Sequence, residues 1–251
     1  MNKAPVLLFS AIRSEHAALA RGLGSNHPIP ARGVVQHIPF PQSSLWLLHS
    51  GMGPENTCEV LNSTLSAVPC SAVINIGYCG ALAPGIPPSR IILYNECLLI
   101  DRENPTPPSF HPDPFLFSRI AGQFAQSGKD FSVGRGLTVP RIISKSEEKK
   151  DLGLQWAGCA VDMESAIVFS CAKTFGIPCA SIRIVLDEQK QDLPDFSGWT
   201  TPEGKLLLKP SSLIKAISKY DPVLTRQWRE LERNAGKTLE DLAAILKCLF
   251  T

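Results

Sequence analysis

Short apolar runs alternate with stretches of helical spacing along most of the chain. Continuous apolar runs of five to eight residues are typical of strands buried on both faces, whereas apolar residues three and four positions apart are typical of helices. The pattern predicts strands at 4–10, 33–40, 44–50, 71–82, 90–101, 131–139, 160–162 and 179–186, and helices at 14–24, 53–67, 114–126, 145–153, 164–176 and 222–249.

This alternation of strands and helices predicts an α/β protein with helices on both faces of a central sheet. We find no composition break, so we expect a single domain over 1–251, closed by a C-terminal helical extension at about 209–250 with two helices. The segment 104–114 is too rich in proline for regular structure. The charged stretch 145–153 predicts a solvated helix.

Composition excludes several classes of function. The chain has 251 residues, 44% hydrophobic and 19% charged, as in an ordinary soluble protein. A formal net charge of +2 with no basic stripe argues against a nucleic-acid partner. We expect no membrane insertion and a cytoplasmic location, because the N-terminal apolar run is short and broken by Arg13 and Glu15. The eight cysteines form no CxxC pair, so we expect neither a metal cluster nor a disulfide framework.

Two carboxylates flank Met163 in the stretch AVDMESA, at the start of an apolar helix. Capping explains them in part: Asp162 would accept a backbone N–H, and Glu164 would complement the positive end of the helix dipole. An acid after a buried strand, such as Asp187, is often only the first solvated residue. Taken one at a time, these acids do not establish a site.

Acids and glycine turns nevertheless gather at one predicted edge of the sheet. Ligands of α/β sheets bind outside the carboxyl ends of the strands, and Glu15, Glu164 and Asp187 all follow strands. We expect a turn over Gly77–Gly80, where glycine lets backbone approach a ligand closely. A second glycine turn, Gly51-Met52-Gly53, leads into a helix N-terminus that can hold an anion or sugar oxygens.

The order of these motifs, GMGPENT, INIGYCGAL, VDMESA and RIVLDE, resembles the nucleoside phosphorylase/nucleosidase superfamily over roughly residues 4–190. Within it the pattern is similar to the methylthioadenosine/S-adenosylhomocysteine nucleosidases. The spelling VDMES and the C-terminal region look more like the hopanoid-biosynthesis-associated branch, thought to remove adenine from adenosylhopane. The resemblance implies a three-layer α/β/α sandwich with a mixed central sheet. It also implies a homo-oligomer that uses no metal or organic cofactor.

The resemblance also implies roles for individual residues. Asp187 matches the acid that protonates purine N7, and Glu15 the acid that activates the attacking water. Binding roles fall to residues that contact the sugar or the base: Glu164 (ribose hydroxyls), Met163 (under the sugar), Gly51, Met52 and Gly53 (near the ribose or a phosphate), and Tyr78 and Gly80 (near the base). These residue types suit N-glycosidic cleavage, in which one carboxylic acid protonates the leaving group and another carboxylate prepares water.

Three alternatives stay open in the sequence. Tyr78 replaces a small residue such as Ser and the stretch 140–146 lacks the aromatic that stacks on adenine, so the base pocket can be reshaped or degenerate. Phosphorolysis is the second: Asn75 stands where the phosphorylases carry an arginine, which favours water, although Arg13, Arg135 and Arg141 are candidate phosphate ligands. The third is a non-catalytic nucleoside-binding or storage protein.

Overall fold

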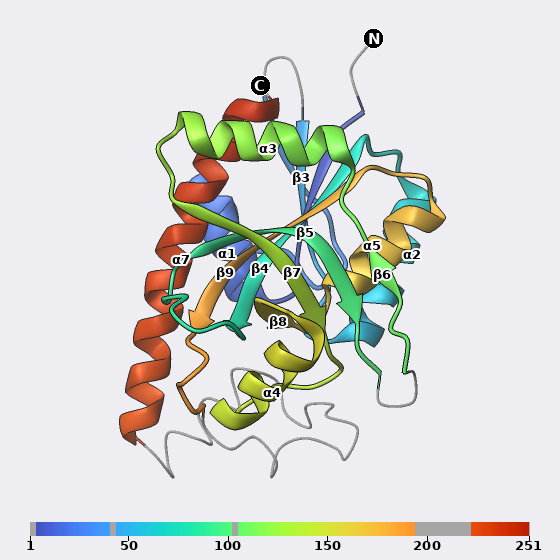
Figure 1. The fold of residues 1–251 in the computed structure, drawn as a ribbon. Helices are drawn as coiled ribbons and strands as arrows, with labels where there is room; N and C mark the ends of the chain where they lie inside the picture. Colours follow the sequence, from blue (N-terminus) through green and yellow to red (C-terminus); the bar gives the residue numbers. More distant parts are fainter. Residues whose placement is uncertain (1–3, 41–43, 102–104, 194–221, 251) are drawn as a thin grey trace.

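The computed structural model describes residues 4–40, 44–101, 105–193 and 222–250 (Figure 1). The predicted strands and helices are present with small shifts at their ends. The proline-rich segment, expected to lack regular structure, also holds a two-residue strand, Ser109–Phe110. The strands are β1 (Val6–Ser10), β2 (Gln36–Pro39), β3 (Ser44–His49), β4 (Ala72–Ala81), β5 (Ile91–Leu99), β6 (Ser109–Phe110), β7 (Phe131–Thr138), β8 (Ala160–Asp162) and β9 (Cys179–Asp187). The helices are α1 (Arg13–Gly22), α2 (Pro54–Ala67), α3 (Pro114–Gln126), α4 (Ser146–Trp156), α5 (Ser165–Thr174) and α7 (Pro222–Phe250).

The sheet is mixed, as expected, with the order β2-β3-β1-β4-β8-β7-β5-β6 and with β9 pairing both β4 and β5. Strand β1 runs parallel to β3 and β4, and β4 runs parallel to β9. Because β9 joins β4 to β5, the strands β4, β8, β7, β5 and β9 pair in a closed ring. This closure brings the ends of β4, β8 and β9 close to one another.

Two hydrophobic cores lie on the two faces of the sheet, which gives the three layers. Helices α1, α3 and α7 cover one core, with Leu19, Ile120 and Leu242 fully buried. Helices α2 and α5 cover the other, with Leu61 and Val168 fully buried. Alternate residues of β1, β4 and β9 point into each core, as the period of a strand requires. Apolar burial on both faces explains why these strands read as continuous hydrophobic runs.

The predicted turn at Gly77–Gly80 is wrong, because β4 continues as a strand to Ala81. The two glycines do not reverse the chain. Their missing side chains let groups of β9 approach the backbone of β4. A Cβ on Gly77 would lie 2.5 Å from Nη1 of Arg183, and one on Gly80 would lie 3.2 Å from Oδ2 of Asp187. The register between β4 and β9 also shifts here, since Cys79 pairs with Val185 and Gly80 pairs with Asp187. Leu186 is the extra residue of this β-bulge.

Helix α4 is largely solvated, as predicted, with one exception. Most of its side chains are exposed or half-buried, but Lys149 has a relative exposure of 0%. The backbone of α4 lies close to the chain that follows β4, because Gly153 has no side chain: a Cβ there would lie 2.6 Å from the carbonyl oxygen of Leu82. The helix therefore packs tightly against the end of the sheet that the acids occupy.

The C-terminal helix α7 belongs to the main core. Its residues Ala235, Leu239 and Leu242 are fully buried beside α1 (Figure 1). The other helix expected in the C-terminal extension falls largely on 209–221, outside the described residues.

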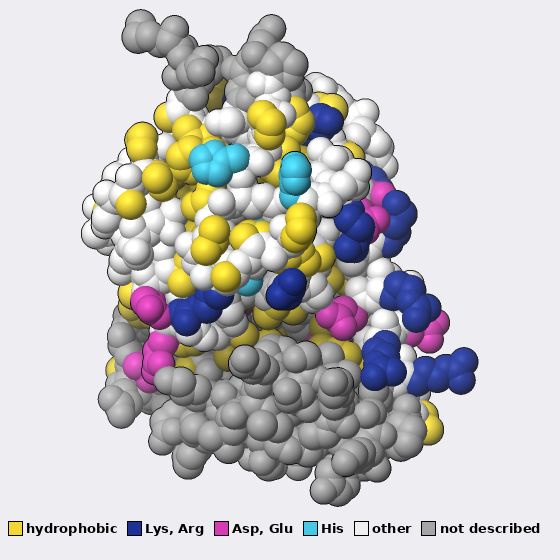
Figure 2. All heavy atoms as spheres, turned by 180° about the vertical axis from the view of Figure 1, so that it is seen from behind, with side chains coloured by type: hydrophobic (Ala, Val, Ile, Leu, Met, Phe, Trp, Pro, Cys, Tyr) yellow, Lys and Arg dark blue, Asp and Glu magenta, His cyan; other side chains and the backbone are white. Residues whose placement is uncertain are grey.

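Seen from the side opposite to that of Figure 1, hydrophobic side chains gather over the upper and middle part of the surface, with charged side chains below them and along one edge (Figure 2). In the described part of the chain, no helix combines the length and apolar character that crossing a membrane requires.

Candidate active site

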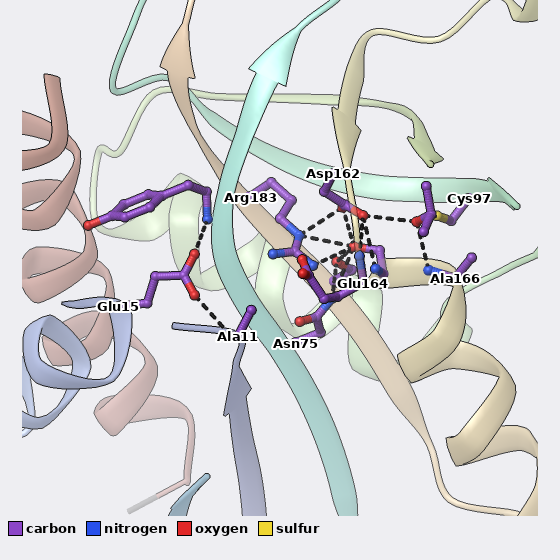
Figure 3. A network of polar contacts seen from close by, with 12 residues as sticks. Ala11, Glu15, Asn75, Cys97, Asp162, Glu164, Ala166 and Arg183 are labelled. Carbon is purple, nitrogen blue, oxygen red and sulfur yellow. Dashed lines mark hydrogen bonds and ion pairs between the residues drawn. The ribbon is translucent and has the colours of Figure 1, made fainter. Parts of the chain in front are cut away.

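Glu15 lies in the first turn of α1, directly after β1, and is almost completely buried. Its Oε2 accepts hydrogen bonds from the backbone N–H groups of Ala11 at 2.9 Å and Ile12 at 3.0 Å. Its Oε1 accepts one from Tyr78 N–H of β4, at 2.7 Å (Figure 3). Burial raises the pKa of this carboxyl, while Arg183 and the three N–H groups act in the opposite direction. The arrangement fixes this carboxyl group beside the sheet.

Arg183, in the middle of β9, is a further candidate residue that the sequence motifs did not single out. Its side chain is completely buried and pairs with Asp162 at 3.0 Å. Nε and Nη2 donate to Ser165 Oγ, at 2.9 and 2.8 Å. Among the described residues Nη1 has no hydrogen-bond partner. Gly77 lies between this Nη1 and Glu15, so the two charged groups face each other across a position that has no side chain.

The charges around Arg183 explain how it stays ionised in the interior. Burial alone would lower the pKa of the guanidinium, but Asp162, Glu164 and Glu15 together raise it above its usual range. Figure 3 shows Arg183 between Glu15 on one side and Asp162 with Glu164 on the other. A signal for this residue was present in the sequence, because an arginine inside a strand as apolar as CASIRIVL is rarely buried without partners.

Asp162 caps α5, as predicted. Its Oδ1 accepts hydrogen bonds from the backbone N–H groups of Glu164 at 3.1 Å and Ser165 at 2.9 Å. The same oxygen accepts one from Thr138 Oγ1 at 2.8 Å. Since Asp162 also pairs with Arg183, this residue links the start of α5 to β7 and β9.

Glu164 points away from its own helix toward α2. Its Oε1 accepts a hydrogen bond from the N–H of Gly53, the residue at the N-terminus of α2, at 2.7 Å. Gly53 has a φ of 97°, which a residue with a side chain rarely adopts. A Cβ there would lie 3.9 Å from Cε of Met163, so Gly53, Met163 and Glu164 form one group. Burial raises the pKa of Glu164 to about 7.

Asp187 ends β9 beside Gly80 and is buried. Its Oδ2 forms an ion pair with Nζ of Lys149. Burial raises the pKa of Asp187, and the ammonium of Lys149 opposes that shift. Lys149 is the second functional candidate that the sequence reading missed, since nothing in the charged stretch distinguishes it from its neighbours.

Three other residues were predicted to contact a ligand: Gly51, Met52 and Tyr78. Gly51 has a φ of 82° in the turn before α2, and the carbonyl of Met52 accepts from Asn56 at 2.7 Å. Tyr78 contributes its backbone N–H to Glu15, while its ring packs on the α1–α7 side, where its hydroxyl lies 3.4 Å from a Cβ built on Gly236.

The predicted acids therefore come together around β4 and β9. Gly77 contacts the Glu15–Arg183 pair, and Gly80 contacts Asp187. The two glycines are three residue steps apart along an extended strand, which is about 10 Å. Glu164 reaches the same region through its interaction with Arg183. Buried carboxyl groups with perturbed pKa values, held at the ends of strands, are typical of a site for acid–base chemistry.

A comparison with protein families matches residues 15–206 to the family described as the phosphorylase superfamily. The search of curated proteins finds no match. Among solved structures, a *Helicobacter pylori* 5'-methylthioadenosine nucleosidase mutant holding 5'-methylthioadenosine is similar, with a TM-score of 0.75, 15% identity, and coverage of 98% of this chain and 97% of that one.

Two further structures share the fold. The futalosine hydrolase of *Helicobacter pylori* has a TM-score of 0.75 and 15% identity, with the same coverage of 98% and 97%. The 5'-methylthioadenosine/S-adenosylhomocysteine nucleosidase of *Neisseria meningitidis* has a TM-score of 0.66 and 17% identity, covering 96% of this chain and 99% of that one. At these identities the similarity establishes the fold, including the expected three-layer arrangement.

Proposed function

The chain belongs to the phosphorylase superfamily, and from that premise we propose that it hydrolyses the N-glycosidic bond of an adenine nucleoside. The observation that carries the proposal is the set of three buried carboxyl groups, Glu15, Glu164 and Asp187, arranged around β4 and β9. Cleavage of this bond builds positive charge on the sugar and negative charge on the base. Separate acids are therefore needed for the base, the sugar and the water.

On the side of the base, Asp187 acts as the general acid. The proton of Asp187 moves to the purine nitrogen N7 as the bond between C1′ and N9 breaks. The electron pair of that bond passes to the base. Burial supports this role because it raises the pKa of Asp187 and so favours the protonated form. The missing side chain of Gly80 lets the carboxyl group lie close against β4, since a Cβ there would come within 3.2 Å of Oδ2.

On the side of the sugar, Glu164 accepts hydrogen bonds from the ribose hydroxyls, and the thioether of Met163 packs under the ring. The contact of Glu164 with Gly53 N–H supports this, since it holds the carboxylate at the N-terminus of α2. Gly51 and Met52 complete the turn at this position. The negative charge of Glu164 also favours the positive charge that develops on the sugar.

Glu15 accepts the proton of the attacking water, whose oxygen forms the new bond to C1′. Both carboxylate oxygens are held by backbone N–H groups, so the group is fixed in place. Arg183 Nη1 faces Glu15 across Gly77 and has no partner among the described residues, which makes it a donor to the same water.

Phosphorolysis is the second candidate, and two of the arginines expected as phosphate ligands already have carboxylate partners, which favours water. Arg135 already pairs with Glu96 at 2.7 Å, and Arg141 pairs with Glu148. Asn75 donates to Ser165 Oγ at 3.0 Å and Ser181 Oγ at 3.1 Å, inside the core.

For the substrate we propose a 5′-modified adenosine such as adenosylhopane. Two considerations support it: a structural neighbour holds 5'-methylthioadenosine, another 5′-modified adenosine, and the VDMES motif is similar to that of the hopanoid-associated branch. We also propose a homo-oligomer in the cytoplasm, which size-exclusion chromatography with light scattering and cell fractionation would test.

The first experiment is chromatographic detection of free adenine from adenosine, methylthioadenosine and an adenosine with a long 5′-alkyl group, each with and without phosphate. Adenine released without phosphate would support the hydrolase, and preference for the alkyl compound would support the hopanoid substrate. Release that depends on phosphate would indicate a phosphorylase. Binding without release of base would indicate a nucleoside-binding protein.

A further inference from the structure

Lys149 of α4 is a charged side chain in a fully enclosed position. Its Nζ pairs with Oδ2 of Asp187 and donates to the backbone carbonyls of Glu188 at 3.1 Å and Gln191 at 2.7 Å. An ammonium group has three N–H donors, so these three acceptors use all of them. The ammonium is therefore oriented in one way only, with one N–H directed at the candidate acid.

Several contacts hold Lys149 in this position. The absence of a side chain at Gly153, one turn after Lys149, lets α4 approach the carbonyl of Leu82. At the start of the helix, Asp192 Oδ1 accepts from Ser146 N–H at 2.8 Å. Leu193 N–H donates to the carbonyl of Ser144 at 2.8 Å. The segment after β9 thus contacts the start of α4 as well as Lys149, and it holds the lysine beside the end of the strand.

Burying an ammonium group in this position costs desolvation free energy unless a partner compensates for it. Desolvation of a buried ion pair often cancels its attraction, and neutral packing can fasten two elements equally well. Here the positive charge lies against the one carboxyl group that the proposed reaction converts from acid to carboxylate. In the described part of the chain, the Asp187 side chain bonds to Lys149 through Oδ2, and Gly80 lies beside the carboxyl group.

We propose that Lys149 is a positioning residue for the Asp187 acid, holding Oδ2 so that Oδ1 carries the proton toward the leaving base. This inference rests on the proposed function. As the glycosidic bond breaks, the Oδ1–H bond of Asp187 breaks and an N–H bond forms on the base. Asp187 becomes a carboxylate, and the ammonium of Lys149, which keeps its own protons, stabilises the new negative charge. Asp187 then takes up a proton from solvent for the next turnover, and the ion pair becomes a charged ammonium beside a neutral carboxylic acid.

The test compares two leaving groups. Adenine in adenosine or methylthioadenosine needs a proton to depart, whereas the nitrophenolate of 4-nitrophenyl ribofuranoside departs without one. The variants are Lys149→Met, Lys149→Arg, Asp187→Asn and the double variant Lys149→Met/Asp187→Asn. Lys150→Met is the matched control, because Lys150 is the exposed neighbour on the same helix. Thermal melts establish that each variant is folded.

We expect Lys149→Met to lower kcat for adenine release about tenfold or more, while nitrophenol release changes less than about threefold. Lys149→Arg should recover part of the loss, because it restores the positive charge. The double variant should be no worse than Asp187→Asn, since coupled residues are not additive. Lys150→Met should match the wild type.

Equal losses on both substrates in a folded Lys149→Met variant, or no loss on either, would overturn the role of Lys149 and leave the proposed function intact. If Lys149→Met does not fold, Lys149→Gln decides in the same way, since it keeps hydrogen-bond donors and removes the positive charge: a loss confined to adenine release supports the role, and an equal loss on both substrates, or no loss on either, overturns it. A wild-type protein that releases neither adenine nor nitrophenol would overturn both proposals.

Discussion

The carboxylate of Glu15 accepts the backbone N–H of Tyr78 at 2.7 Å, across 63 residues of sequence. This bond ties the first turn of α1 to the middle of β4, at the position where Gly77 leaves room for Arg183. The donor is a backbone group, so the hydrogen bond does not depend on which side chain residue 78 carries. A tyrosine here is therefore compatible with a working Glu15, provided that its ring keeps its place against α7.

Asp187→Asn should lower turnover of an adenine nucleoside at least about a hundredfold, because an amide cannot deliver a proton to the base. Steady-state release of adenine measures the effect. Glu188→Gln is the matched control, since its side chain is the next along the chain and contacts only Lys190 at 3.5 Å among the ion pairs described. Near-normal turnover in Asp187→Asn would remove the general acid from the mechanism.

Glu15→Gln should abolish most hydrolysis, again by about a hundredfold or more, because the amide does not accept the proton of water. Calorimetry should show that the nucleoside still binds, which places the loss in the chemical step. Phosphate-dependent release that survives in this variant would identify phosphate as the nucleophile. Some loss of stability is also expected, since an amide N–H₂ would face a backbone N–H in place of a carboxylate oxygen.

Gly77→Ala should damage both stability and activity. The new Cβ would lie 2.5 Å from Nη1 of Arg183 and 2.6 Å from Oε1 of Glu15, so one of these groups must move. Overpacking of this kind typically costs about 1–3 kcal/mol. Urea denaturation and adenine release measure the two effects. Gly122→Ala in α3 is the control, because nothing lies within 4 Å of its Cβ and alanine favours helix; equal behaviour of the two variants would contradict the crowding.

Glu164→Gln should stabilise the protein at alkaline pH while weakening its activity. Burial raises the pKa of Glu164 from 4.5 to about 7 in the folded state. Between these values the folded protein holds a proton that the unfolded chain releases, so stability falls as the pH rises through this window. Glutamine removes the penalty, which is roughly 3 kcal/mol above pH 7.

Urea denaturation of the wild type and Glu164→Gln at pH 5 and pH 8 tests this directly. The advantage of the variant should be larger at pH 8 than at pH 5. A constant difference between the two pH values would mean that Glu164 titrates alike in the folded and unfolded states.

Most of the fold could be predicted from the sequence because its strands are buried on both faces and its helices carry a clear apolar stripe. The error at Gly77–Gly80 has a physical reason. Glycine indicates a place without room for a side chain, and the sequence does not say whether the chain turns there or another residue approaches. In this protein the approaching groups are Arg183 and Asp187, both from β9.

The three acids of the candidate site could be found because each follows a strand, and strand ends share an edge. Arg183 and Lys149 were missed because their roles depend on partners that are distant in sequence. Lys149 and Lys150 are chemically identical neighbours, yet only the first faces inward. Which face a charged helix presents is decided by packing, here by the close approach at Gly153.

The bulge at Leu186 has a consequence for the segment that follows the acid. Val185 pairs with Cys79, yet Gly80 meets Asp187 and not Leu186, so two residues of β9 lie opposite one residue of β4. One residue of extended strand is about 3.3 Å long. Removing this one leucine would leave every charged residue in the sequence, yet it would draw the chain after β9 back by about that distance, and with it the carbonyls of Glu188 and Gln191 that hold Lys149.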